Sequence, residues 1–80
     1  MATRQRFTAQ LQDGDGLVLA TQTRFAMNSA IRMTEQLLRE LARPLKVSFE
    51  GQKPEREGDV YRRRWVGEDG SVVIAIASKE

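Results

Sequence analysis

Apolar and polar residues alternate in two segments near the start of the chain, with a short interruption between them. The alternation runs over residues 7–12 and resumes over residues 17–25. A period of two is typical of strands that bury one face. The intervening Gly-Asp-Gly at 14–16 fits a three-residue turn whose last position is left-handed and favours glycine. The pattern therefore predicts a β-hairpin with Leu11 opposite Leu19.

The following segment changes to apolar spacings of three and four, which predicts an amphipathic helix. Asn28 or Ser29 is expected to cap its start, and Pro44 to end it after Arg43. The apolar stripe consists of Met27, Ala30, Ile31, Thr34, Leu37, Leu38 and Leu41. In a chain of 80 residues a sheet needs a cover, so this stripe is expected to pack on the strands.

Three further strands are predicted in the second half of the chain. Residues 45–50 alternate in a short strand, and residues 60–66 and 72–78 flank a turn at 67–70 as a second hairpin. Residues 51–59 are polar and contain a proline, which indicates a mobile loop.

The prediction is therefore a single small α+β domain over residues 1–80, in the order ββαβββ. One helix packs on one face of a mostly antiparallel sheet, and the order of elements is that of β-grasp domains.

Alternation also assigns each strand residue to a face of the sheet. The predicted helix-facing residues are Phe7, Leu11, Leu17, Leu19, Val47, Phe49, Tyr61, Trp65, Val72, Ile74 and Ile76. The predicted outward-facing residues are Arg4, Arg6, Gln10, Val18, Ala20, Gln22, Arg24, Lys46, Arg62, Arg64, Val73, Ala75 and Ala77. Trp65 should pack between helix and sheet, so Trp65→Ala is expected to cost about 3–5 kcal/mol.

Charge adds a second pattern, because basic residues gather on the predicted strands while acidic residues gather in the turns. The chain has 13 basic and 11 acidic residues, a net charge of +2. The outward-facing bases are Arg4, Arg6, Arg24, Lys46, Arg62 and Arg64. A one-sided basic surface favours an anionic partner, either nucleic acid or an acidic protein surface.

These features predict a small non-catalytic binding or regulatory module that binds nucleic acid through a basic open sheet face. No aromatic residue is placed on that face, so binding would depend on the phosphate backbone and have little sequence preference. The alternative is a protein–protein interaction module: an adaptor, an inhibitor of a larger complex, or a homodimer. It would use the arginine rim and an apolar patch formed by Val18, Ala20, Val73, Ala75 and Ala77.

Arg63 is harder to place, because it shares a face with Tyr61 and Trp65. It is expected to lie at a strand edge, to extend past the aromatic rings, or to contact a buried anion.

The residue inventory argues against catalysis. The chain has no His and no Cys, which excludes the commonest general base, thiol chemistry and the usual zinc ligand sets. Its paired acids lie in solvated turns, where a carboxylate is a poor general acid. We therefore expect no enzyme, no cofactor and no metal. No apolar run approaches the roughly 20 residues of a membrane span, and no signal-peptide stretch is present, so a cytoplasmic protein is expected.

Overall fold

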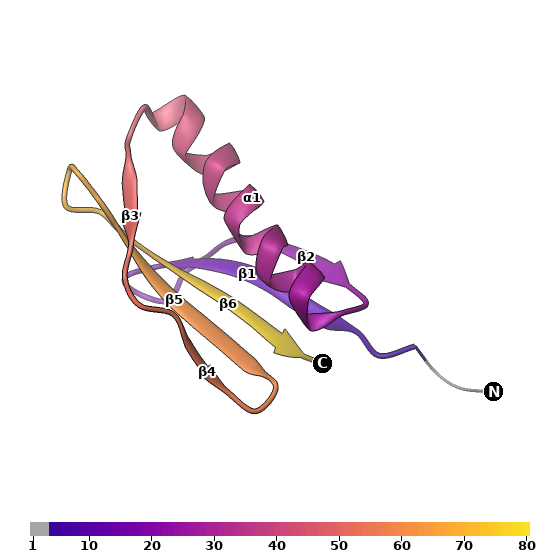
Figure 1. Cartoon of the computed structure of the whole chain (residues 1–80). Helices are drawn as coiled ribbons and strands as arrows, with labels where there is room; N and C mark the ends of the chain where they lie inside the picture. Colours follow the sequence, from indigo (N-terminus) through magenta and orange to yellow (C-terminus); the bar gives the residue numbers. More distant parts are fainter. Residues whose placement is uncertain (1–3) are drawn as a thin grey trace.

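The computed structural model describes residues 4–80, which form a six-stranded sheet with one helix across one face (Figure 1). The elements in chain order are β1 (Phe7–Asp13), β2 (Val18–Arg24), α1 (Met27–Leu45), β3 (Phe49–Gly51), β4 (Glu55–Glu57), β5 (Val60–Gly67) and β6 (Val72–Lys79). The strands are ordered β2-β1-β6-β5-β3, and β4 also pairs with β5. The predicted α+β fold is confirmed, and each strand pair is antiparallel. β4 is a strand that the sequence did not predict.

The first hairpin has the predicted turn but not the predicted register. Asp13 and Leu17 flank a three-residue loop, and Gly16 has a φ of 90°. The Asp13 carboxylate accepts hydrogen bonds from the N–H groups of Asp15 and Leu17, both at 2.9 Å. This turn would place Leu19 opposite Leu11, but a β-bulge at Leu19 places Ala20 there instead. Beyond the bulge, the even-numbered residues of β2 face the helix, which reverses the prediction.

The second hairpin contains the same kind of turn. Gly67 and Ser71 flank the three-residue loop at 68–70, and Gly70 has a φ of 87°. Trp65 consequently lies opposite Val73. Odd-numbered residues of β6 therefore face the helix, and the predicted inward position of Val72, Ile74 and Ile76 is wrong.

Helix α1 begins earlier and ends later than expected. Ala26 is the N-cap residue, with no side-chain cap, so Asn28 and Ser29 lie within the helix. Pro44 lies in the last turn instead of ending the helix, which closes at Lys46 in the left-handed conformation. The buried helix residues are Met27, Ala30, Met33, Thr34, Leu37 and Leu38. The Thr34 hydroxyl is satisfied by donating to the Ile31 carbonyl at 2.6 Å.

The segment predicted as a mobile loop contains strand β4 and most of a tight hairpin. Glu57 lies opposite Val60 across a two-residue loop in which Gly58 has a φ of 59°. A Gly-Asp pair between two strands is a recognised hairpin signal. The predicted strand at 45–50 is reduced to β3, because the helix extends through its first residue.

The core lies where α1 packs over β1, β6 and β2. The strand residues beneath the helix are mostly small: Ala9, Ala75 and Ala77 are fully buried, beside the larger Leu11. Small side chains allow a helix backbone to approach a sheet closely. Of the aromatic strand residues, Phe7 lies on β1 and Tyr61 on β5, both buried, whereas Phe49 on β3 and Trp65 on β5 are partly buried beside the core.

Candidate interaction surfaces

Within residues 4–80, no helix or strand covers the face of the sheet opposite α1 (Figure 1). We call it the open face. Its centre is a row of branched aliphatic residues on two adjacent strands. The row consists of Val66 from β5 and Val72, Ile74 and Ile76 from β6. All four side chains are half-buried by their neighbours. A continuous row of large, partly exposed aliphatic side chains on an uncovered sheet face is typical of an interaction surface.

Arg62 and Arg64 lie beside this row, on the same face and both exposed. Their cross-strand neighbours in β6 are Ile76 and Ile74. On the other side of β5, however, the open face becomes acidic. Glu55 lies directly opposite Arg62, and Glu57 lies opposite Val60. From β6 across β5 to β4, the open face therefore changes from an aliphatic band to a basic band and then to an acidic margin. The uniform basic character expected from the sequence is absent.

The six bases predicted to share the open face are dispersed in the structure. Arg62 and Arg64 are on it. Arg24 faces the helix side because of the bulge in β2, and its Nη2 lies 2.8 Å from Met33 Sδ.

The other three bases lie outside the strands. Lys46 is at the C-cap of α1, while Arg4 and Arg6 precede β1. The Arg4 guanidinium lies 4.6 Å from the centre of the Phe25 ring. Whether any of the six binds a partner stays a prediction.

The predicted apolar patch is also different in composition. Val73, Ala75 and Ala77 are buried beneath the helix, and Ala20 faces the same side. Val18 alone of the predicted set lies on the open face, opposite Gln12. Both differences have the same cause, a shift by one residue that reverses which side chains of a strand face the helix. In the second hairpin the loop is 68–70 instead of the predicted 67–70, and in the first hairpin the bulge at Leu19 shifts the register. The aliphatic row that results has larger side chains than the predicted patch.

Arg63 adopts a fourth arrangement, in which its charge is stacked on an aromatic ring. The guanidinium lies 4.3 Å from the centre of the Trp65 ring, and Nε–H donates to the Gln52 carbonyl at 2.8 Å. Gly51 leaves the space for it, because a Cβ there would lie 2.6 Å from the guanidinium. The side chain is held by a cation–π contact and a backbone hydrogen bond, so no bound anion is needed to explain it.

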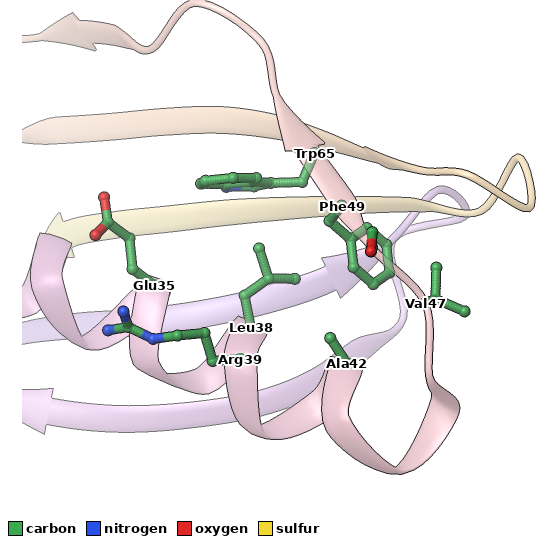
Figure 2. Close-up of a pocket in the computed structure, with 8 residues that line it drawn as sticks. Glu35, Leu38, Arg39, Ala42, Val47, Phe49 and Trp65 are labelled. Atoms are coloured by element: carbon green, nitrogen blue, oxygen red, sulfur yellow. The ribbon is translucent and has the colours of Figure 1, made fainter.

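A cleft of about 420 Å³ separates the C-terminal half of α1 from β3 and β5. Figure 2 shows Trp65 and Phe49 on its sheet side, with Leu38 facing them from the helix. Glu35 and Arg39 lie at its rim (Figure 2). The cleft could not be predicted from the sequence, because it depends on how the helix lies relative to β5. Trp65 is thus partly buried at the margin of the core, and is not enclosed between helix and sheet as expected.

One carboxyl group on the described surface has a lowered pKa. In the turn at 68–70, hydrogen bonds from the Ser71 hydroxyl and N–H to Oδ1 lower the pKa of the Asp69 carboxyl below its usual value of 3.8. This shift belongs to a turn motif and keeps the acid ionised. Among residues 4–80, no three acidic, His or Cys side chains are grouped so that they could hold a metal ion.

Comparison with known proteins does not identify a relative. No protein-family model, curated protein or solved structure matches the chain. Within the described part of the chain, no helix is both long and apolar enough to cross a membrane. The functional argument therefore rests on the surfaces described above.

Proposed function

We propose that the protein is a non-catalytic interaction module that binds a partner protein on its open face. The aliphatic row of Val66, Val72, Ile74 and Ile76 is the observation that supports this function. Burying branched aliphatic side chains contributes roughly 25 cal/mol per Å² of apolar surface removed from water. A complementary partner has an apolar centre, with carboxylates placed over Arg62 and Arg64.

The structure suggests a variant that removes the apolar character without removing strand propensity. Ile74→Thr with Ile76→Thr keeps β-branched side chains in β6 but replaces the ethyl branch of each isoleucine with a hydroxyl. The matched control is Leu45→Thr, because Leu45 is 58% exposed at the end of α1 and lies outside the sheet.

Capture from lysate, with and without nuclease, then tests the proposal. Wild-type protein and the Leu45→Thr control should retain the same protein partner after nuclease treatment, and the double Thr variant should lose it. Retention by the double Thr variant, with circular dichroism showing an intact fold, would contradict the proposal.

Nucleic-acid binding is the second candidate, and one observation favours it. Arg62, Arg64 and Lys53 line a shallow hollow of about 300 Å³, which also contains one acid, Glu55. Three bases around a hollow could contact successive phosphates. The adjoining acidic margin of Glu55 and Glu57 opposes this function, and so does the aliphatic row, which offers no ring for base stacking.

Salt dependence separates the two functions. Phosphate contacts lose affinity linearly with the logarithm of salt concentration, with a slope of roughly −0.9 per contact on duplex DNA. Arg62→Glu with Arg64→Glu should abolish oligonucleotide binding measured by fluorescence anisotropy and reduce the salt slope. If wild-type protein binds oligonucleotides with a steep slope that the double Glu variant loses, nucleic acid replaces protein as the partner.

A further inference from the structure

Strand β2 forms one edge of the sheet and has no neighbour on its outer side within residues 4–80. It is seven residues long, contains no proline, and carries no charge before Arg24. An edge strand presents unpaired N–H and C=O groups along its outer side, which can pair with another strand. Natural proteins usually protect such an edge with charges, prolines, short strands or β-bulges, and of these β2 has the bulge at Leu19 and a charge only at its last residue, Arg24.

The opposite edge of the sheet is protected by short strands, a proline and charged residues. It consists of β3 and β4, each of three residues, with Pro54 between them. Its strands include Glu50, Glu55 and Glu57. The two edges of one sheet therefore differ in their capacity to accept a further strand.

Exposed hydrophobic residues are concentrated at the same edge. Six large apolar side chains are exposed in the described part of the chain, and four of them lie on β2 or next to its ends. These four are Leu17, Val18, Leu19 and Phe25, with exposures of 64%, 48%, 39% and 50%. An apolar cluster beside an unpaired strand edge indicates a surface that is covered in the functional state.

We propose that β2 pairs antiparallel with β2 of a second copy of the chain, across a two-fold axis at Gln22. This register pairs the regular segment 20–24 of the two strands, with the bulge residue Leu19 just before it and Phe25 just after it. Leu19 therefore comes close to the partner's Phe25, so that exposed apolar side chains lie together at each end of the interface. A two-fold axis makes the same surface serve both subunits, as in most homodimers.

The charge distribution along β2 is compatible with this pairing. Arg24 lies opposite the partner's Ala20, so the single charged residue of each strand does not meet its own copy. Thr21 lies opposite the partner's Thr23, a favourable cross-strand pair on the open face. The two sheets become one, and the two open faces become one continuous surface.

Gln22 allows a test that does not disturb the open face. Its side chain is exposed and points to the helix side of the sheet, away from the aliphatic row. Gln22→Lys places two lysines opposite each other across the axis, and Gln22→Glu places two glutamates there. Each variant should dimerise at least about tenfold more weakly than the wild type in sedimentation equilibrium. An equimolar mixture should recover the association, and native mass spectrometry should show the Lys/Glu heterodimer.

Two results would overturn this inference. One is a wild-type protein that remains monomeric throughout the concentration series. The other is a dimer that Gln22→Lys and Gln22→Glu leave unchanged, or that their mixture fails to restore. The inference does not depend on the proposed function, since Ile74→Thr with Ile76→Thr should leave a β2-paired dimer intact. A dimer lost only in that variant would place the second copy on the open face instead.

Discussion

The helix side of the sheet has two halves that are packed in different ways. Under α1, the strands β1 and β6 carry Ala9, Ala75 and Ala77 with the larger Phe7, Leu11 and Val73, and the helix itself excludes water. β5 and β3 make few contacts with the helix, and the rings of Tyr61, Trp65 and Phe49 supply the cover, of which only Tyr61 is fully in the core. Because six of the seven buried hydrophobic strand residues lie on β1 and β6, we expect most of the stability to reside in the first half, while the second half accommodates a cleft.

The largest expected effect lies in the half covered by the helix. Leu11 is fully buried, opposite Ala20 on one side and Ala75 on the other. Leu11→Ala should lower the free energy of unfolding by about 2–5 kcal/mol, because its small neighbours cannot fill the cavity. Urea unfolding followed by circular dichroism measures the loss. Leu17→Ala, at an exposed turn position, is the control and should change stability by less than about 0.5 kcal/mol.

A smaller effect is expected for Trp65, the tryptophan of the uncovered half. Trp65 lines the cleft and is only partly buried, so Trp65→Ala should cost about 2 kcal/mol, below the roughly 3–5 kcal/mol of a fully buried aromatic. The same urea experiment compares it directly with Leu11→Ala. A loss for Trp65→Ala that equals or exceeds that of Leu11→Ala would show that the two halves contribute equally, and would contradict the contrast drawn between them.

The stacking of Arg63 on Trp65 should contribute less to the free energy of unfolding than the Trp65 side chain itself. Arg63→Lys keeps the charge but removes the planar group over Trp65 and the Nε–H donor to Gln52. The expected cost is about 0.5–1 kcal/mol. Unfolding can be followed by the fluorescence of Trp65, the single tryptophan of the chain. Arg64→Lys is the matched control on the next residue. The Arg64 side chain is exposed on the open face, so this change should leave the free energy of unfolding unaltered.

The smallest effect concerns the turn that joins β5 and β6. The lowered pKa of Asp69 means that its ionised form is favoured by folding, so its contribution is present above the usual pKa of 3.8. That contribution is lost as the pH falls through the lower pKa of the folded state. The difference in melting temperature between wild type and Asp69→Asn should therefore narrow on acidification below that value. Ser71→Ala should return the pKa of Asp69 toward its usual value in an NMR titration, and an unchanged pKa would remove Ser71 as the cause.

Local sequence was sufficient for the elements that depend on neighbouring residues. The helical stripe, the two long hairpins and the turn closed by Gly16 were all predicted from spacing, because periodicity and glycine conformation act over a few residues. The register of the second hairpin could also have been predicted from the sequence. The same three-residue turn, ending at Gly70, fits both hairpins, and its use would have placed Val73 opposite Trp65.

The candidate surfaces depended on contacts between distant segments. A bulge at Leu19 decides which residues of β2 face the helix, and it places Ala20 in the row of small side chains that α1 covers. Pairing of β4 with β5 places Glu55 beside Arg62 and so limits the basic character of the open face. The cleft at Trp65 likewise depends on the position of the helix. A one-residue change in register reverses the faces of a strand at almost no local cost, so its outcome is determined by which side chains fit beneath the helix.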